Sequence, residues 1–277
     1  MGQKVVIGYY PNDTKITMGI YSYNRSNFLY ILAFIFVISV IIIGGVKGVK
    51  SLVALLFTLT CCIFLLIPLM IKGVNPVGAS IFIAILSTIV TLLLVSGYNI
   101  KTISAIIGTT IGICISGGLT YIFGNLANLS GINISEAENI FFIAERTGLK
   151  MHGILFAGIL IASLGAIMDV AMSISSSVNE IHSHNNKLSM NKLFLSGMNI
   201  GKDIIGTMTN TLILAFTGGS IGILLLVFSY YMPYIKLINL DLLGIEILQG
   251  LTGSIGIVLS VPATALVSSY LYKKYSN

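Results

Sequence analysis

Long apolar runs separated by short polar connections dominate this chain. A helix that crosses a membrane needs about 20 mostly apolar residues, because each residue adds about 1.5 Å against a hydrocarbon core of about 30 Å. Spanning helices are therefore predicted at Phe28–Gly45, Leu52–Ile71, Val77–Gly97, Thr102–Phe123, Met151–Ala171, Asn210–Met232 and Leu248–Tyr272. The first four are joined by only a few residues, so we expect them to run up and down as neighbours. The pattern predicts an all-α, polytopic membrane bundle of about seven transmembrane helices.

Three segments outside these runs are predicted to carry other structure. Val5–Tyr10 and Lys15–Tyr23 are short β-like runs around a Pro-Asn-Asp turn, which predicts a hairpin-like N-terminal stub. Between residues 124 and 150, Ser135 precedes Glu138 by three positions, which predicts a capped amphipathic helix on the membrane surface. The Met- and Leu-bearing segment Leu188 to Met208 is a second interfacial candidate. The expected divisions are a stub (1–27), a transmembrane helical domain (28–273) and a tail (274–277).

Composition agrees with a chain that lives in the lipid bilayer. The chain is 56% hydrophobic and 9% charged, whereas ordinary soluble domains are roughly a quarter charged. The net charge of +6 comes from basic residues placed in ones and twos between apolar runs, so no nucleic-acid-binding patch is predicted. Cys61, Cys62 and Cys114 lie inside predicted spans without metal-ligand or disulfide spacing, and we interpret them as apolar packing residues.

The distribution of charge favours one orientation in the membrane. Residues 1–27 have no apolar segment typical of a cleavable signal peptide. With seven spans the two termini face opposite sides. One side carries most of the acidic residues, namely Asp13, Glu136, Glu138, Glu145, Asp241 and Glu246. Basic residues concentrate in the short loops of the other side, which also holds the C-terminus, so we expect the N-terminus outside and the C-terminus in the cytoplasm.

A polar stripe runs along the fifth predicted helix and its extension. Asp169, Ser173, Ser176 and Glu180 are spaced by four, three and four residues, so they share one helix face. A carboxylate at the centre of a spanning helix costs about 2.5–3.5 kcal/mol on insertion scales and normally faces a partner, a cavity or a pathway. Asp169 therefore requires a physical reason for its position.

The next helix offers that reason in the segment from Gly201 to Thr211, which also contains Asp203. We expect Asn210 to reach a depth similar to that of Asp169, so that Asp169, Thr207, Asn210 and Thr211 form one polar cluster between the two helices. One interpretation is a proton- or cation-linked transport site, with Asp169 as the titrating or coordinating carboxylate. The other is a structural staple, because Ser, Thr, Asn and Asp also hydrogen-bond one membrane helix to another.

The sequence gives little indication of a metal site or of a catalytic site. His182 and His184 form a short His-x-His motif, but no completing ligand is visible, so solvated loop histidines are expected and no metal site is assigned. The chain has no nucleophile elbow, Walker motif, dinucleotide fingerprint or zinc-protease motif, and no cofactor is predicted. We expect no enzyme, although an acid pair of Asp169 and Asp203 leaves one catalytic arrangement open.

Two long motifs resemble those of the YibE/F-like family of bacterial membrane proteins. The first runs from Gly165 to Ser177 as GAIMDVAMSISSS, with Asn179-Glu180 following, and the second runs from Ser196 to Asp203 and on through Gly206 to Ala215. The resemblance covers residues 28–273 and implies a multipass protein of the bacterial cell membrane. The order Gly165, Asp169, Glu180 is also similar in pattern to proton-driven exporters of the SecD/SecF and RND kind.

The resemblance also implies something about partners. Longer members of the family carry an additional N-terminal helix and an extracytoplasmic domain, where this chain has only residues 1–27. A second membrane subunit is a candidate source of that domain, and a homo-oligomer is a further possibility. The sequence thus leaves two functions open: a permease or export component with a polar site around Asp169, or a non-transporting scaffold or subunit of a larger membrane complex.

Overall fold

The computed structural model describes residues 5–12, 15–129, 151–230 and 232–275. These residues are helical except for one two-stranded hairpin and short connections. The chain divides into two units, residues 1–53 and residues 54–277. The predicted surface helix between Ser135 and Gly148 lies outside the described residues.

The first unit begins with the hairpin that the sequence predicted. Strands β1 (Val5–Asn12) and β2 (Lys15–Tyr23) pair antiparallel, with Val5 opposite Tyr23 and a register irregularity after Val6. Helix α1 (Ser26–Cys61) follows and continues into the second unit. At Gly45 its backbone leaves the helical region, with φ of 53° and ψ of −135°. Because this conformation suits only glycine, the sequence itself specifies where the helix is interrupted.

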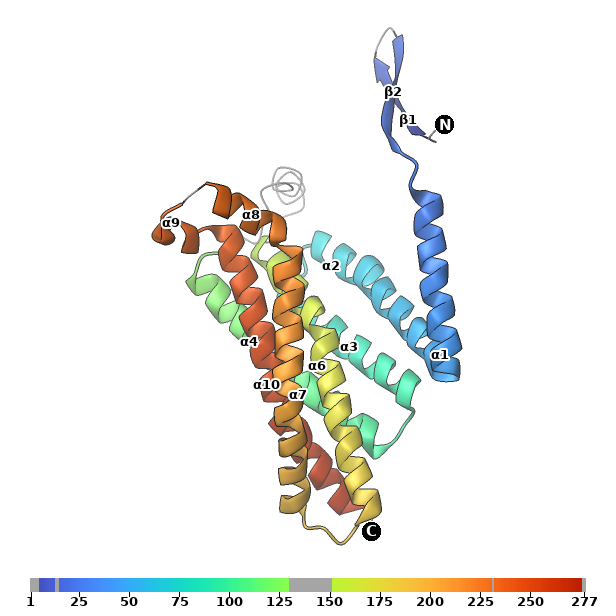
Figure 1. Ribbon diagram of the computed structural model, residues 1–277, viewed down its shortest axis with the longest axis vertical. Helices are drawn as coiled ribbons and strands as arrows, with labels where there is room; N and C mark the ends of the chain where they lie inside the picture. Colours follow the sequence, from blue (N-terminus) through green and yellow to red (C-terminus); the bar gives the residue numbers. More distant parts are fainter. Residues whose placement is uncertain (1–4, 13–14, 130–150, 231, 276–277) are drawn as a thin grey trace. The chain divides into compact units, whose positions relative to one another are not determined.

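The second unit is a bundle of long helices with a few short ones (Figure 1). Asn75 and Asn99 start two of the long helices, since their side chains accept hydrogen bonds from the amides of Val77 and Thr102. After α1 the elements are η1 (Cys62–Leu66), α2 (Ile67–Ile71), α3 (Pro76–Ser96), α4 (Ile100–Leu126), α6 (Met151–His184), α7 (Met190–Gly219), α8 (Ile221–Ser229), α9 (Tyr234–Ile238) and α10 (Asp241–Tyr275).

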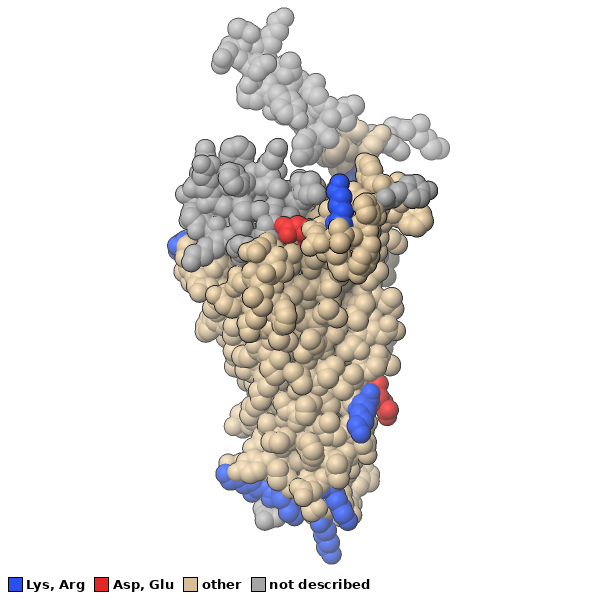
Figure 2. Space-filling model, turned by 90° about the vertical axis from the view of Figure 1, so that its left-hand side faces the viewer, with Lys and Arg blue, Asp and Glu red and all other residues tan. Residues whose placement is uncertain are grey.

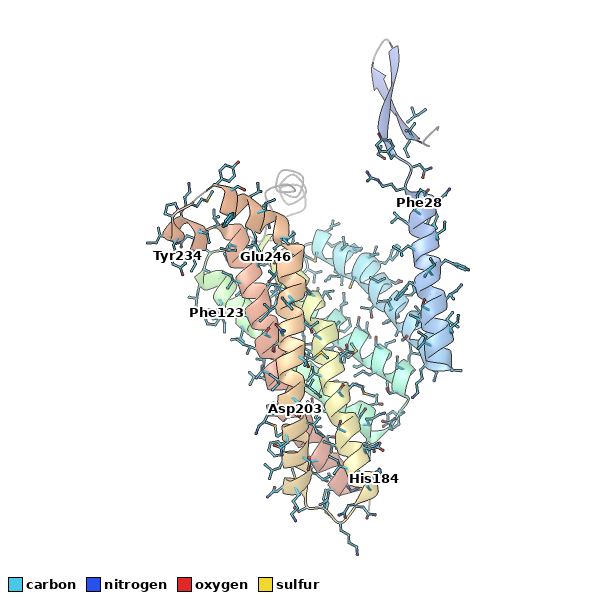
Figure 3. The ribbon with its side chains drawn as sticks, in the orientation of Figure 1. Phe28, Phe123, His184, Asp203, Tyr234 and Glu246 are labelled. Atoms are coloured by element: carbon cyan, nitrogen blue, oxygen red, sulfur yellow. The ribbon has the colours of Figure 1, made fainter. Side chains whose placement is uncertain are left out.

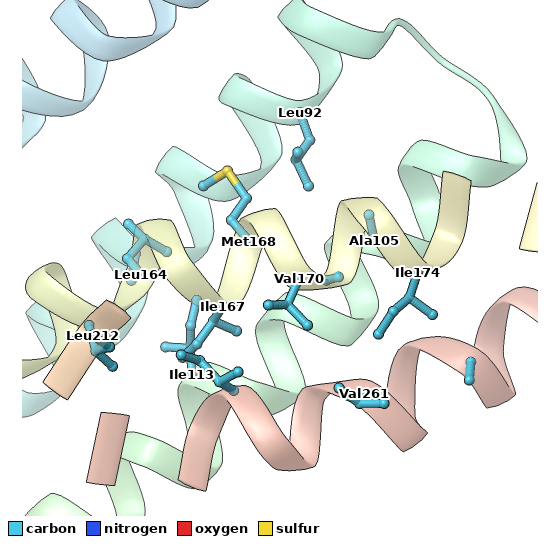
Figure 4. Close-up of a cluster of buried hydrophobic side chains, with 14 of the residues drawn as sticks. Leu92, Ala105, Ile113, Leu164, Ile167, Met168, Val170, Ile174, Leu212 and Val261 are labelled. Atoms are coloured by element: carbon cyan, nitrogen blue, oxygen red, sulfur yellow. The ribbon is translucent and has the colours of Figure 1, made fainter. Parts of the chain in front are cut away.

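Helices α4, α6, α7 and α10 pack around one apolar core, with α3 against α4 and α6. Ile167, Val170 and Ile174 of α6 are fully buried, and they lie with Val261 of α10 in this cluster (Figure 4). A buried aliphatic side chain packs tightly against its neighbours, so few other orientations of its helix are tolerated. The apolar side of α6 therefore determines which way this helix faces.

A second kind of contact joins α4 to α10 through small residues. A Cβ added to Gly112 would lie 2.9 Å from Ser260 Cβ and 3.0 Å from the Gly256 carbonyl oxygen. About two turns further along α4, Thr120 donates a hydrogen bond of 3.0 Å to Thr252 Oγ1. The two antiparallel helices meet at small residues every fourth position, and we call this contact the α4–α10 seam: Ser104, Gly108, Gly112, Ser116 and Thr120 on α4, with Thr252, Gly256, Ser260, Thr264 and Ser268 on α10. Small residues let two helix backbones approach closely in a membrane.

Five described helical stretches are long and apolar enough to cross a membrane, or six if the bent pair α7–α8 is one span. Residues 26–71 form one of the five, and they contain both of the first two spans predicted from sequence, on either side of Gly45. The count of seven therefore stays a prediction, while the all-α membrane class is confirmed.

Two predicted boundaries on the C-terminal half are wrong. The predicted separation of Leu188–Met208 from the sixth span is wrong, because residues 190–219 form one helix, α7, with Leu193, Gly197 and Gly201 buried against the bundle. An interfacial position of this segment stays a prediction. The predicted sixth span, Asn210–Met232, is not one straight helix, since α7 ends at Gly219 and α8 leaves it at an angle of 61°. In both cases packing against neighbouring helices, which a hydropathy window does not contain, sets the boundary.

Candidate functional site

The polar stripe on α6 faces away from the bundle core. Asp169, Ser173 and Glu180 are exposed and Ser176 is half-buried, whereas Val170, Ile174 and Val178 on the other side of the helix are buried. The stripe shares a single helix face, as the four, three and four spacing predicted. Aliphatic side chains such as Ile167 and Val170 occupy the inward positions, so the polar residues are left on the outside.

The predicted polar residues of α7 are also on the outside. Asp203, Thr207, Asn210 and Thr211 are all exposed, and Asp203 is labelled on the lower half of this helix in Figure 3. The hydroxyl of Thr207 donates to the Ile204 carbonyl at 3.0 Å, and that of Thr211 donates to the Thr207 carbonyl at 2.8 Å. Both hydroxyl protons are thus used within α7 and not across to α6.

The register between α6 and α7 fixes the relative depth of these residues. A Cβ at Gly197 would meet Val178, and one at Gly201 would approach Ile174 at 3.5 Å. Continued for five more residues along each helix, this antiparallel pairing sets Gly206 at the level of Asp169. Asn210 therefore lies about one helical turn beyond Asp169, near the level of Gly165.

The inward cluster that we predicted between the two helices is not formed. Asp169 makes no hydrogen bond or ion pair with Asn210, or with any other residue that the structure describes. The eight side chains form instead an outward surface that we call the α6–α7 polar face: Asp169, Ser173, Ser176, Glu180, Asp203, Thr207, Asn210 and Thr211. Ser and Thr can satisfy their hydroxyls on their own helix, so nothing forced them inward.

Small residues extend the α6–α7 polar face along both helices. Gly158, Gly165 and Gly206 are exposed, and a Cβ on any of them would have no atom within 4 Å. Four cavities of about 300 to 590 Å³ are lined by described residues, and none of the eight polar side chains contributes to them. The face is an open surface and not a closed pocket.

The histidine motif behaves differently from the solvated loop that we predicted. His182 is 5% exposed and packs against the ring of Tyr272 at 5.4 Å between ring centroids, while exposed His184 contacts the Glu180 carbonyl oxygen through Nδ1 at 2.9 Å. Their side chains thus lie in different environments because α6 continues to His184. Within the described part of the chain, no group of three or more His, Cys, Asp or Glu side chains is placed to hold a metal ion.

Several buried polar groups were not anticipated from the sequence. Ser87, Thr109, Ser116 and Ser254 each bury a hydroxyl that has no hydrogen-bond partner among the described residues. Ser116 belongs to the α4–α10 seam. A run of small residues at four-residue spacing was the available signal, but it indicates close packing and does not distinguish a buried hydroxyl from an exposed one.

Comparison with known proteins gives one match. A family model described as YibE/F-like protein matches residues 32–274, which is most of the chain and includes both motifs that carried the resemblance. No curated protein and no solved structure gives a significant match.

Proposed function

This chain belongs to the YibE/F-like family, and on that premise we propose that it is a subunit of a membrane transport complex, acting as a permease or export component. In this proposal the α6–α7 polar face lines one side of a polar path, and another membrane surface completes the path. The observation that carries the proposal is the position of Asp169 on the outside of a helix apolar enough to span a membrane.

The free-energy cost of exposing a carboxylate to lipid supports this proposal. Helix α6 has 34 residues and is about 50 Å long, so it is longer than a hydrocarbon core of about 30 Å. Asp169 lies near the C-terminal end of the predicted span Met151–Ala171. An ionised carboxylate facing acyl chains there carries part of the cost of about 2.5–3.5 kcal/mol that insertion scales give for the helix centre. Water in a pathway, or polar groups of a partner, would remove that cost.

The neighbouring glycines favour a partner helix at the same face. Gly158, Ala162 and Gly165 continue the α6 stripe at helical spacing, which is the pattern that the α4–α10 seam uses inside the bundle. Small outward residues permit close approach of a helix backbone. We propose that the partner is a second membrane subunit. A second copy of this chain is the other candidate.

The second candidate function is a scaffold that assembles a membrane complex without transport. The same exposed stripe supports it, because a polar and small-residue surface also suits a permanent helix–helix contact. In both functions the proposed role involves binding and passage, not covalent chemistry, and we propose no catalytic use of Asp169 and Asp203.

Reconstitution separates these possibilities. Proteoliposomes with the chain and any copurifying subunit would be tested for proton or solute movement, using Asp169→Asn to remove the charge and Asp169→Glu to retain it. Ser183→Ala serves as a control, since its exposed hydroxyl bonds to the Glu180 carbonyl at the end of α6. Loss of flux with Asp169→Asn and recovery with Asp169→Glu support transport.

The remaining outcomes are equally decisive. Absence of flux from the wild-type complex, together with loss of a copurifying subunit in Asp169→Asn, would support the scaffold. Unchanged flux and unchanged subunit composition in Asp169→Asn would overturn any role for the α6–α7 polar face.

A further inference from the structure

A cavity lies beside the break between α7 and α8. The break is centred on Ser220, where the chain turns by 61°, and the cavity of about 300 Å³ is lined by residues of α7, α8 and α10. Figure 3 labels Glu246 on α10, near the end of α7 where the chain turns into α8. Discontinuous membrane helices commonly border binding sites, because the interruption leaves polar backbone and side chains beside a space.

Three of the eleven lining residues carry side-chain oxygens: Thr217, Ser220 and Glu246. Glu246 is the ionisable one, and it has no hydrogen bond or ion pair with any described residue. Ser220 is 5% exposed, and among the described residues its hydroxyl makes no hydrogen bond, while its backbone amide bonds to α7. Thr217 donates its proton to the Ile213 carbonyl at 2.8 Å, so its oxygen is free to accept.

The charge in this cavity comes from Glu246. The C-terminal carbonyls of α7 and the N-terminal amides of α8 meet at Ser220, and their partial charges have opposite signs. The amide of Ser220 also donates to the carbonyls of Phe216 and Thr217, at 3.0 and 3.2 Å. The site is thus negatively charged, rich in hydrogen-bond acceptors and surrounded by apolar walls. Such a site favours a positively charged ligand.

The apolar walls decide between a bare metal ion and an organic cation. A Ca²⁺ ion takes 6–8 oxygen ligands and Mg²⁺ demands an octahedral set, which three oxygen-bearing side chains do not supply. The rest of the lining is apolar or glycine, including Phe216, Leu224 and Leu243. A volume of about 300 Å³ lies at the lower end of the range for small-molecule sites.

We propose that this cavity binds an organic cation, an ammonium or phosphonium group carried on an apolar body, with Glu246 as its counter-ion. Ser220 and Thr217 supply neutral oxygens, and the walls contact the apolar body. The site shares no residue with the α6–α7 polar face, so it stands independently of the proposed transport path. The cation is either a free amphipathic molecule or the ammonium headgroup of a phospholipid.

Binding of radiolabelled tetraphenylphosphonium to the purified full-length chain in detergent tests this site. We expect saturable binding that Glu246→Gln weakens by about tenfold or more, since an unscreened counter-ion contributes at least that factor. Tetraphenylborate has the same shape and the opposite charge, and we expect it not to compete. Displacement by phosphatidylethanolamine would assign the site to a lipid headgroup, and no displacement would assign it to a free cation.

A variant that fills the cavity without changing its charge tests whether the loss of binding in Glu246→Gln comes from this site. Gly250 is buried in the lining, and a Cβ there would have no atom within 4 Å, so Gly250→Leu should fill the cavity and abolish binding. Gly118→Leu is the control, because Gly118 is exposed on α4 with the same free space and lines none of the described cavities. Equal binding by wild type, Glu246→Gln and Gly250→Leu, or equal binding of tetraphenylborate, would overturn the proposal.

Discussion

Buried hydroxyls in this protein are satisfied mainly by their own helices. Thr88 donates to the Ala84 carbonyl at 2.8 Å, and Thr264 donates to the Ser260 carbonyl at 2.7 Å. A Ser or Thr that bonds back to the carbonyl four residues earlier needs no partner on a neighbouring helix. It then behaves as a small side chain, which explains how α4 and α10 pack closely although their contact is rich in polar residues.

Gly112 tests the tightness of that contact. Gly112→Ala would place its Cβ 2.7 Å from Ile167 Cγ2 and 2.9 Å from Ser260 Cβ, and we expect a loss of about 1–3 kcal/mol, as for other overpacked sites. Gly118→Ala on the same helix has open space and should be neutral or stabilising by about 0.5–1 kcal/mol. Thermal unfolding of both variants in detergent measures the difference. Equal midpoints would show that the seam is loosely packed.

The hydrogen bond between Thr120 and Thr252 contributes a smaller amount. Thr120 Oγ1 lies 2.8 Å from the Ser116 carbonyl oxygen and 3.0 Å from Thr252 Oγ1, so it keeps one acceptor when the other is removed. We therefore expect a coupling energy of about 0.6 kcal/mol, the average for such bonds in membrane helices. A double-mutant cycle with Thr120→Val and Thr252→Val measures it. A coupling above about 2 kcal/mol would contradict this account.

At the scale of elements, interruptions of long helices are the informative features. Gly45 interrupts α1, and Ser220 separates α7 from α8. The two have different origins. The first depends on a glycine in a conformation that other residues avoid, whereas Ser220 has ordinary backbone angles, with φ of −97° and ψ of 10°. Only the first is specified locally.

Gly45→Ala tests that local specification. At φ of 53° an L-residue carries a steric cost of roughly 1–2 kcal/mol, so we expect lower stability of the folded chain. Gly44→Ala is the matched control, because Gly44 has no positive φ and open space around its Cβ. The yield of monodisperse protein after graded heating compares the two. If Gly45→Ala survives heating as well as Gly44→Ala, the interruption does not depend on glycine.

At the scale of the whole molecule, basic residues gather at one end of the second unit. Figure 2 shows a broad uncharged band on this face above a lower end where basic residues gather, with neighbouring acidic and basic side chains just above that end. Lys187, Lys273 and Lys274 lie at or just beyond the ends of α6 and α10. A basic end is typical of the cytoplasmic side.

Two exposed tyrosines test the orientation that we predict. In a background with Cys61, Cys62 and Cys114 replaced by Ala, Tyr23→Cys and Tyr275→Cys place single thiols at residues that are 58% and 62% exposed. We expect a membrane-impermeant maleimide to label position 23 in intact cells and position 275 only after permeabilisation. Labelling of both positions in intact cells would require an even number of spans.

The sequence by itself determined that this chain is an all-α membrane protein of the YibE/F-like family. Partition into lipid depends on composition over about 20 residues, and the motifs from Gly165 to Ala215 are local strings, so neither needs a fold. The hairpin was also predictable, because its two runs and the Pro-Asn-Asp turn between them are adjacent in sequence. The shared face of Asp169, Ser173, Ser176 and Glu180 followed from helical spacing alone.

Only the tertiary structure decided which way that face points. Spacing places Asp169 and Ser173 together but is silent on whether they or Ile167 and Ile174 meet the neighbouring helix. In water, burial would favour the aliphatic side, but in lipid both sides find an apolar environment, and packing decides. The same holds for the bend at Ser220 and the cavity beside it, since both depend on contacts among α7, α8 and α10 that no single helix contains.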